Sequence, residues 1–426
     1  MTGPTNHPSM DIIGTLGSEL AGRSIALCIT GSVAAVRCVD IARLLMRHGA
    51  QVIPVMTQAA CDLISPELME WATGHPAVTC LTGAIEHVAL AGNVANPCHL
   101  VLVAPATANT IGKIAAGIDD TPVTTVVTTA VGEGIPVMVV PAMHEPMYRH
   151  PLVMRNIETL NQFGIPVFVP PVSEGKAKIP DPEAVVTMVR SLLEFEGDRP
   201  LRGKRVVITA GRTVEYLDPI RVVSNNSTGR MGTALAATAA ALGANVTLVL
   251  GKAVVDPPVG VHTVQVETAE QMQKAVETEL AGTGSGTTAA VDIFVAAAAV
   301  GDWKAVRQAD TKVTTHGTDT LTVELTPTPK ILDSVKKLSP ATKVIAFRAQ
   351  HGFTPQELYD DAFARLQKAG ADMIAANDTA QDGVGFESTT NQMLLVHADG
   401  SRVDLPLADK VQIALGIWKD FLHTVV

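Results

Sequence analysis

Residues 23–57, RSIALCITGSVAAVRCVDIARLLMRHGAQVIPVMT, carry the pattern that decides the fold of the first half of the chain. Residues 23–30 are apolar and partly β-branched, and residues 31–33 have the small polar composition of a turn. The apolar spacing of residues 34–49 is that of an amphipathic helix, and residues 50–57 are apolar again. This order of strand, turn, helix and strand predicts a βαβ unit with parallel strands.

The same alternation continues toward residue 171. We expect a strand at 99–105, a helix at 107–117, a strand at 134–143, a helix near Val153–Phe163 and a strand at 165–171. Alternating strands and helices of this length are typical of a doubly wound parallel α/β sheet.

A polar stretch with Gly and Pro, EFEGDRPLRG at 194–203, precedes a fresh strand pattern, KRVVITAG. We therefore expect a loose N-terminal extension (1–20), a first domain (21–193), a linker (194–202) and a second domain (203–426). In the second domain the patterns predict helices near Met231–Leu242 and Pro355–Lys368, strands at 244–251, 292–300, 343–350 and 372–378, a hairpin at 393–407 and a final helix at 408–422. The composition of residues 282–288, GTGSGTT, predicts a flexible connection.

Composition limits the class of protein. The chain has 426 residues, too many for one ordinary core, since a domain typically has about 100–200 residues. Its net charge is −10 and it has no run of Lys or Arg, which argues against nucleic acid as a partner. All five cysteines precede residue 99 without CxxC spacing, and we find no signal peptide or long apolar span. These features predict a protein of the cytoplasm.

Small and hydroxylated residues follow three strands of the first domain, where an α/β sheet binds its ligand. They are Gly31-Ser32-Val33, Met56-Thr57 and residues 105–110, PATANT. Taken alone, GSV is an ordinary tight turn. PATANT, however, resembles the PASANT motif of the homo-oligomeric flavin-containing cysteine decarboxylases. The resemblance implies that FMN is bound by Gly31, Ser32, Val33, Thr57, Pro105, Thr107 and Asn109.

Two further segments extend this resemblance. His87 lies where the family has its active-site histidine, and PAMHEPM at 141–147 resembles the substrate motif PxMNxxMW, which implies substrate contacts from Met143 and Met147. Two positions depart from the family. The motif's Asn is His144 here, and SEGKAKIP at 173–180 replaces a segment that carries a cysteine in bacterial members. Lys176, Lys178 or His144 would have to replace that cysteine as the acid, and the sequence does not choose among them.

The second domain carries a longer signature. TAGRTVEYLDPIRVVSNNSTGRMG at 209–232 resembles the phosphopantothenate–cysteine ligase signature TAGxTxExLDPVRxIxNxSSGKMG. Residues 224–232 supply amides, hydroxyls and an Arg at a helix N-terminus, which stabilise a phosphate or an acyl-phosphate. The resemblance implies that Asn225 contacts the acyl-nucleotide and that Arg221 binds a substrate carboxylate or phosphate.

Other ligase motifs lie further along the chain. AAAAVGD at 296–302 resembles the family's AAVAD strand end, and Lys312 has the spacing of the essential lysine. TPTPKIL at 326–332 resembles the NPDIL loop, and DMIAAND at 372–378 resembles the closing signature DxIVAND. Gln350 replaces the family's Glu, and the lysine motif near 365–368 is displaced by one residue. The resemblance implies nucleotide contacts from Ala296, Ala297, Ala298, Ala299, Asp302, Lys312, Pro329, Lys330, Ile331, Leu332, Phe347, Arg365 and Lys368.

The chain therefore resembles the bifunctional coenzyme A biosynthesis family, in its archaeal form, from about residue 20 to the end. The family implies two Rossmann-like domains, a flavodoxin-like decarboxylase followed by a ligase α/β domain. It implies CTP with Mg²⁺ and FMN as cofactors, and ligation of 4′-phosphopantothenate to cysteine before decarboxylation to 4′-phosphopantetheine. It also implies a homo-oligomer, either trimers of dimers or a dodecamer. The sequence does not indicate the metal ligands.

Two alternative interpretations stay open at this point. The first domain could be a non-catalytic FMN-binding regulatory module, because its decarboxylase cysteine is absent. A nicotinamide oxidoreductase with two Rossmann-like domains is the second, but no GxGxxG precedes an acidic ribose contact.

Overall fold

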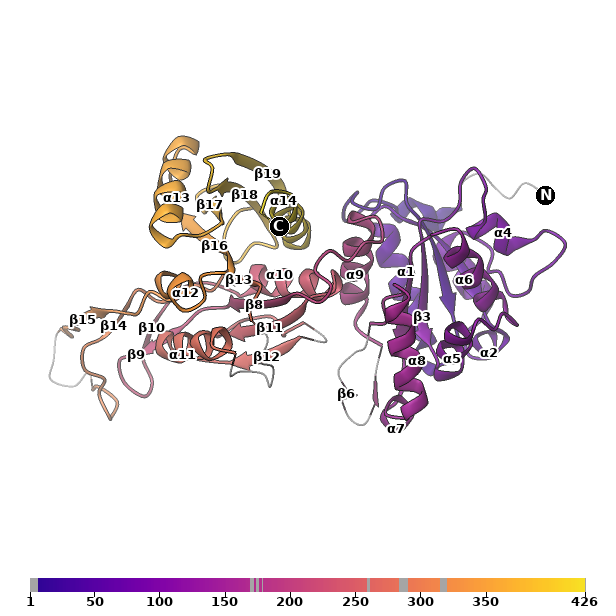
Figure 1. The fold of residues 1–426 in the computed structure, drawn as a ribbon, viewed down its shortest axis with the longest axis horizontal. Coiled ribbons are helices and arrows are strands. Elements are labelled where there is room, and N and C mark those ends of the chain that lie inside the picture. Colours follow the sequence, from indigo (N-terminus) through magenta and orange to yellow (C-terminus); the bar gives the residue numbers. More distant parts are fainter. Residues whose placement is uncertain are drawn as a thin grey trace. The chain divides into compact units, whose positions relative to one another are not determined.

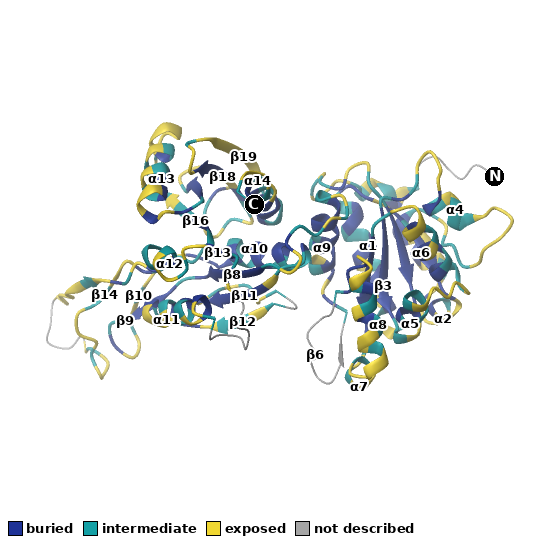
Figure 2. Cartoon of the chain, viewed as in Figure 1, coloured by how far each residue is buried: buried dark blue, intermediate teal, exposed yellow. Residues whose placement is uncertain are grey.

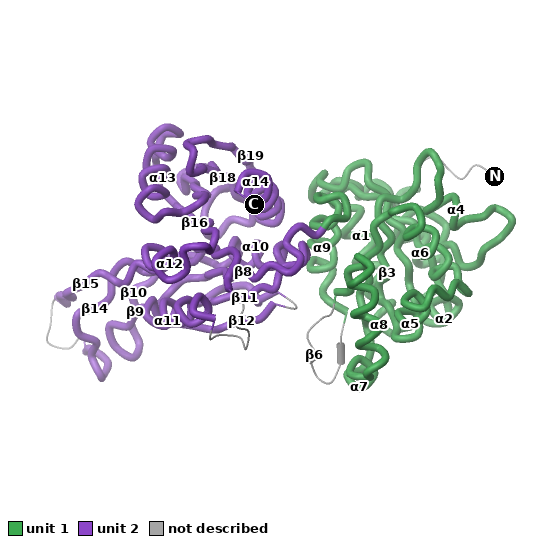
Figure 3. The backbone as a smooth tube through the Cα atoms, viewed as in Figure 1, with its two compact units in different colours: residues 1–198 green, residues 199–426 purple. Residues whose placement is uncertain are grey.

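The computed structural model describes residues 7–168, 172–173, 176–177, 179–258, 261–282, 290–314 and 320–425. They form two compact units, which divide the chain into Met1–Asp198 and Arg199–Val426 (Figure 3). Apart from Gly282, the connection expected at 282–288 lies outside the described residues. None of the helices in these ranges has the length and hydropathy that a membrane span requires.

Unit 1 contains a parallel sheet in the order β2-β1-β3-β4, whose strand β3 is labelled in Figure 1. Its strands are β1 (Ser24–Ile29), β2 (Gln51–Met56), β3 (Leu100–Ala106) and β4 (Val137–Pro141). Beyond β4, Val167 makes one isolated parallel bridge to Val139, so the described part of the strand expected at 165–171 contributes a single bridge. This order is that of flavodoxin-like folds, and it confirms the expected architecture.

Helices cover this sheet because its strands are apolar on both faces. The helical segments are η1 (Pro8–Ile12), η2 (Val33–Arg37), α1 (Cys38–Arg47), α2 (Gln58–Cys61), α3 (Pro66–Thr73), α4 (Glu86–Ala91), α5 (Ala108–Ala116), α6 (Pro122–Gly132), α7 (Glu145–Tyr148), α8 (Pro151–Gln162) and α9 (Pro182–Glu194). Helix α1 packs against α3 and α9, whereas α4, α5, α6 and α8 share a buried cluster with the strands (Figure 2). Three short strands, β5 (Met143–His144), β6 (Val172–Ser173) and β7 (Lys176–Ala177), form a separate sheet.

The expectation of a loose extension at 1–20 is wrong for residues 7–20. The backbone N–H groups of Gly14 and Leu16 donate to the carbonyls of Met46 and Arg47, at 3.0 and 2.9 Å. Leu20 is buried, and Glu19 contacts the Nδ1 atom of His48 at 3.0 Å. These contacts attach the segment to the end of α1, so it forms part of unit 1.

Unit 2 contains an eight-stranded sheet in the order β12-β11-β8-β13-β16-β17-β18-β19. The strands are β8 (Arg205–Ala210), β11 (Asn245–Leu250), β12 (His262–Gln265), β13 (Ile293–Ala296), β16 (Lys343–Gln350), β17 (Met373–Asp378), β18 (Thr390–His397) and β19 (Arg402–Asp409). Pairing is parallel from β12 to β17 and antiparallel from β17 to β19, which includes the expected hairpin of β18 and β19. Strand β13 is shorter than the sequence predicts, because the chain leaves the ladder after Ala296.

The helices that pack on this sheet in the described part of the unit are α10 (Arg230–Ala241), α11 (Ala269–Leu280), α12 (Leu332–Leu338), α13 (Pro355–Ala369) and α14 (Lys410–Thr424). Helices α10 and α14 pack together, and the Trp418 indole donates to the Leu235 carbonyl at 3.2 Å. Residues of α11, α12 and α13 share a second buried cluster with the strands. Two antiparallel hairpins complete the unit, β9 (Val214–Tyr216) with β10 (Val222–Ser224) and β14 (Trp303–Ala305) with β15 (Leu325–Pro327).

Candidate functional site

A cavity of about 500 Å³ lies in unit 2, lined by residues that follow the carboxyl ends of several parallel strands. This is where an open α/β sheet binds ligands, and the volume is in the range of small-molecule sites. The structure brings together on its wall most of the residues expected to contact a nucleotide. They are Ala296, Ala297, Ala298, Ala299, Asp302, Pro329, Lys330, Ile331, Leu332, Phe347, Arg365 and Lys368.

The N-terminus of α10 forms one side of this cavity. Gly229 precedes the helix with a φ of +79°, a conformation that other residues rarely adopt, and a Cβ there would lie 2.7 Å from the Cβ of Ala253. A Cβ on Gly232 would lie 2.5 Å from that of Ala210. Both glycines therefore allow the helix to begin directly beside β8, with its first N–H groups available to an anion.

Asn225, Arg221 and Lys312 are not among the residues that line the cavity. The Asn225 side chain is exposed, but its Nδ2 atom donates to the carbonyl of Ala299 at 3.1 Å, which connects it to the cavity wall. Arg221 donates through Nη1 to Asp218 at 2.8 Å and to the carbonyl of Val313 at 2.7 Å. Lys312 is exposed and precedes Val313.

Asp218 is the centre of this arrangement. Its buried carboxylate accepts hydrogen bonds from the backbone N–H groups of Ile220 and Arg221 at 2.8 and 2.7 Å, and from that of Val313 at 3.1 Å. These bonds, first of all the one from the Arg221 amide, lower the pKa of Asp218 to about 2. The ionised carboxylate thus holds the turn that carries Arg221 against the segment that carries Lys312.

Ion pairs fix several charged side chains of the cavity wall. Lys330 pairs with Asp302, and Arg365 pairs with Asp333 at 2.8 Å. Arg348 binds Asp361 through Nε and Nη2, at 2.7 and 3.1 Å, a two-bond geometry that orients the guanidinium.

Gln350, where the sequence departs from the expected Glu, donates to the same Asp361 carboxylate at 2.8 Å. Both bonding partners hold the pKa of Asp361 below its ordinary value, with the Arg348 contact as the larger cause. The substitution at 350 is therefore part of an Arg348–Asp361–Gln350 network.

In unit 1 the three expected ligand loops follow neighbouring strands of the sheet. Ser32, Thr57 and Thr107 each cap a helical segment by accepting a backbone N–H, at 3.4, 3.2 and 3.3 Å. Gly31 lies so close to α2 that a Cβ would be 2.6 Å from the Cβ of Ala59. Helix N-termini at the carboxyl edge of the sheet form a suitable cradle for a phosphorylated ligand.

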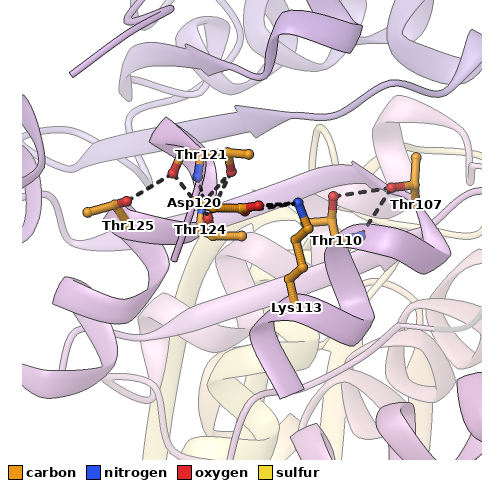
Figure 4. A network of polar contacts seen from close by, with 7 residues as sticks. All are labelled: Thr107, Thr110, Lys113, Asp120, Thr121, Thr124 and Thr125. Carbon is orange, nitrogen blue, oxygen red and sulfur yellow. Dashed lines mark hydrogen bonds and ion pairs between the residues drawn. The ribbon is translucent and has the colours of Figure 1, made fainter. Parts of the chain in front are cut away.

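The loop after β3 is held by a polar network (Figure 4). The Thr107 and Thr110 hydroxyls are 3.1 Å apart, and Lys113 binds Asp120 at 2.8 Å. Thr121 and Thr124 then cap the start of α6. The contact between Lys113 and Asp120 fixes α5 relative to the start of α6.

The remaining candidate residues of unit 1 lie on other elements. His87 lies on α4, and its Nδ1 atom is buried with no hydrogen-bond partner among the described residues. His144 is exposed on β5 and is paired in register with Lys176 of β7, beside Met143 and Ala177. Met147 is exposed on α7. Lys178 lies outside the described residues.

Comparison with known proteins shows the family to which the chain belongs. Residues 14–194 match the Flavoprotein family, and residues 201–424 match the C-terminal domain family of DNA/pantothenate metabolism flavoproteins. A Coenzyme A biosynthesis bifunctional protein CoaBC from Thermococcus kodakarensis is 45% identical over 96% of this chain and 97% of its own length. The chain belongs to the CoaBC family. A CoaBC protein of Bacillus subtilis is 34% identical over 94% of this chain and 97% of its own length. The solved C-terminal domain of a CoaBC protein is 32% identical, covers 53% of this chain and 97% of its own length, and has a TM-score of 0.42.

Within this CoaBC-family chain, sequence reasoning missed several polar residues of the cavity. Arg348, Asn377, Asn391 and Lys410 line it. Arg230 lines it too and is the arginine that the sequence placed at a helix N-terminus. Asn377 lies in the quoted motif DMIAAND. Lys410 begins the expected C-terminal helix, but no spacing rule relates it to α10.

Proposed function

We propose that the chain catalyses two successive steps of coenzyme A biosynthesis. It would join 4′-phosphopantothenate to cysteine with a nucleoside triphosphate, CTP in the first instance, and then decarboxylate the product to 4′-phosphopantetheine. One observation carries this proposal: the first residues of α10 line the same cavity as Lys330, Arg365 and Lys368, in a chain that aligns with a CoaBC protein over 96% of its length.

In the ligase step the substrate carboxylate attacks the α-phosphate of the nucleotide, which forms an acyl-nucleotide and releases pyrophosphate. The cysteine amine then displaces the nucleotide. Cations near the departing phosphates stabilise the negative charge that develops on them. We assign this role to Lys312, and we assign contact with the acyl-nucleotide to Asn225, whose amide is held by Ala299.

We expect Mg²⁺ to enter the site with the nucleotide. Magnesium is commonly bound by one or two carboxylates together with substrate phosphates. Among the described residues that line the cavity, Asp302 and Asp333 are the ones that carry carboxylates.

The decarboxylase step requires an electron sink, which FMN supplies when bound. The first domain fits that group, because Ser32, Thr57 and Thr107 start three helical segments at one edge of the sheet. We propose that His87 acts on the substrate and that Met143 and Met147 contact it. Proton transfer to the product is assigned to His144 or Lys176, whose Cα atoms are paired on adjacent strands, or to Lys178.

A non-catalytic flavin module remains the second candidate function for unit 1. The specific observation in its favour is the absence of any cysteine beyond Cys98. Bound FMN without release of CO₂ from phosphopantothenoylcysteine would establish this candidate.

We further propose that the protein acts in the cytoplasm as a homo-oligomer, as trimers of dimers or as a dodecamer. The hairpins β9–β10 and β14–β15 of unit 2 expose Ile220, Trp303, Val306 and Leu325. Apolar side chains gathered on such hairpins support pairing of two ligase units. Light scattering on Trp303→Lys should show a smaller assembly than the wild type.

The proposal is tested in two separate reactions. Ligation is followed with 4′-phosphopantothenate, cysteine, Mg²⁺ and one nucleoside triphosphate at a time, and decarboxylation is followed with phosphopantothenoylcysteine supplied directly. We expect an adduct with CTP in the first reaction and CO₂ in the second. If no adduct forms with any of the nucleotides, the ligase assignment is refuted.

To identify the proton donor of the decarboxylase step, His144→Ala, Lys176→Ala and Lys178→Ala are compared in the second reaction. The variant that stops product formation while retaining bound FMN identifies it.

A further inference from the structure

One end of the unit 2 cavity gathers four polar side chains, of which the sequence indicated only the arginine at the start of the helix. They are Arg230 at the start of α10, Asn377 of β17, Asn391 of β18 and Lys410 at the start of α14, and we call them the polar end. Lys410 is only 7% exposed, although lysine is rarely buried without a charged partner. A cation at the first position of a helix is also disfavoured by the helix dipole. Both features make a lysine at this position costly to the stability of the fold.

The two cations of the polar end have no carboxylate partner among the described residues. Lys410 donates through Nζ to the carbonyls of Gly385 and Phe386, at 3.0 and 3.4 Å. The Nε atom of Arg230 is buried and has no hydrogen-bond partner in the described parts of the chain. Desolvation, and secondly the charge of Arg230, lower the pKa of Lys410 to about 8. Two neighbouring cations without a carboxylate partner favour the binding of an anionic ligand.

The asparagines add neutral donors to the same end. Asn377 is 8% exposed and Asn391 is 4% exposed, and both line the cavity. Asn377 has no side-chain hydrogen bond among the described residues, and Asn391 uses only its Oδ1 atom, which accepts the N–H of Gln392 at 3.0 Å. Buried amides are normally paired, so unused donors facing a cavity indicate a polar ligand.

Hydrogen bonds to the Phe386 carbonyl hold the polar end in place. The Thr228 hydroxyl, one residue before Gly229, donates to the Phe386 carbonyl at 2.6 Å, and Lys410 binds the same carbonyl. These bonds hold the segment at 385–386 beside the start of α10. A preorganised site avoids the entropic cost of ordering its groups on binding.

We propose that Lys410, together with Arg230, Asn377 and Asn391, binds a phosphoryl group of a substrate at the N-terminus of α10. The identity of the substrate rests on the proposed function. The phosphoryl group comes either from the nucleoside triphosphate, as the part released as pyrophosphate, or from the phosphate ester of 4′-phosphopantothenate.

Direct binding distinguishes these two sources. Calorimetric titrations with pyrophosphate, CTP–Mg²⁺ and 4′-phosphopantothenate are made separately on the full chain and on Lys410→Gln and Arg230→Gln. Loss of one charge-assisted hydrogen bond should weaken binding by about 10-fold or more. Weaker pyrophosphate and CTP binding assigns the site to the nucleotide, and weaker binding of 4′-phosphopantothenate alone assigns it to the acid substrate.

Two controls keep the result interpretable. Lys343→Gln removes the same charge from a half-exposed lysine of unit 2 that does not line the cavity, so it should leave all three affinities unchanged. The Arg230 Nε atom has no hydrogen-bond partner among the described residues, so Arg230→Gln should unfold at the wild-type temperature and decide the question even if Lys410→Gln fails to fold.

If all three ligands bind Lys410→Gln and Arg230→Gln within twofold of wild type, the proposal is overturned. Pyrophosphate binding is measured without turnover, so this result is independent of whether the chain ligates cysteine.

Discussion

The carboxylate of Asp218 accepts a hydrogen bond of 3.1 Å from the backbone N–H of Val313, 95 residues further along the chain. The same carboxylate binds the Arg221 guanidinium at 2.8 Å. Lys312 immediately precedes Val313, so one buried charge holds both candidate substrate-binding cations in a common frame. Neither Arg221 nor Lys312 lines the cavity, but both are attached to Asp218, Arg221 directly and Lys312 through its neighbour Val313.

Asp218→Asn should lower ligase activity and leave flavin binding intact. The amide keeps the size of the side chain but accepts hydrogen bonds through one oxygen in place of two, so the Arg221 and Val313 contacts weaken. We expect kcat/KM for ligation to fall by about 10-fold or more, which corresponds to one charge-assisted hydrogen bond. Steady-state ligation kinetics and the flavin absorbance of the same preparation measure the two effects.

The stability of unit 2 should depend on pH through the same residue. The pKa of Asp218 is about 2 in the folded protein, below the ordinary value of about 4 for an unfolded chain. Its contribution to stability is thus complete above pH of about 4 and is lost as the pH falls toward 2. Unfolding midpoints in this range should fall more steeply for the wild type than for Asp218→Asn, and parallel curves would contradict the assignment.

Lys312→Ala should abolish ligation without changing the fold. Lys312 is exposed, so its removal leaves no buried group unpaired, and the loss reports on substrate charge alone. Lys274→Ala, an exposed lysine of α11, is the matched control and should ligate at the wild-type rate. Equal rates in the two variants would show that Lys312 has no part in the reaction.

Asp361→Asn should raise the KM for the nucleotide more than it changes kcat. Arg348 lines the cavity and is oriented by two bonds to Asp361, at 2.7 and 3.1 Å. With the carboxylate replaced, the guanidinium loses its fixed direction, and we expect a rise in KM of about 3- to 10-fold. Initial rates over a range of CTP concentrations separate the two parameters. An unchanged KM with a lowered kcat would place Arg348 in another role.

Gly31→Ala should weaken FMN binding. The added Cβ would lie 2.6 Å from the Cβ of Ala59, so the loop after β1 must move away from α2. Gly132→Ala is the control, because nothing lies within 4 Å of a Cβ at that position. The ratio of flavin to protein absorbance after purification should fall for Gly31→Ala and stay constant for Gly132→Ala.

Local patterns in the sequence predicted most of the fold. The period of the apolar residues gave α10, α13 and α14 within a few residues of their bounds, and the Asp399-Gly400 pair gave the hairpin of β18 and β19. The N-terminal segment was misjudged because its attachment depends on backbone bonds to Met46 and Arg47, which leave no periodic signal.

The candidate site, too, was predicted only in part from the sequence. Motif resemblance gave the segments at 296–302 and 326–332, which meet on the cavity wall. It did not indicate Lys410 or Arg348, because each acts through partners from distant elements, Phe386 and Asp361. Such contacts are set by tertiary packing, which the spacing of residues in one segment does not encode.

The most direct test of the account is a single mass-resolved reaction of the purified, FMN-loaded protein with 4′-phosphopantothenate, cysteine, CTP and Mg²⁺. We predict that phosphopantothenoylcysteine forms first and is then converted to 4′-phosphopantetheine with loss of CO₂. A reaction that stops at the cysteine adduct would contradict the decarboxylase assignment of unit 1, and the absence of the adduct would contradict the account of unit 2.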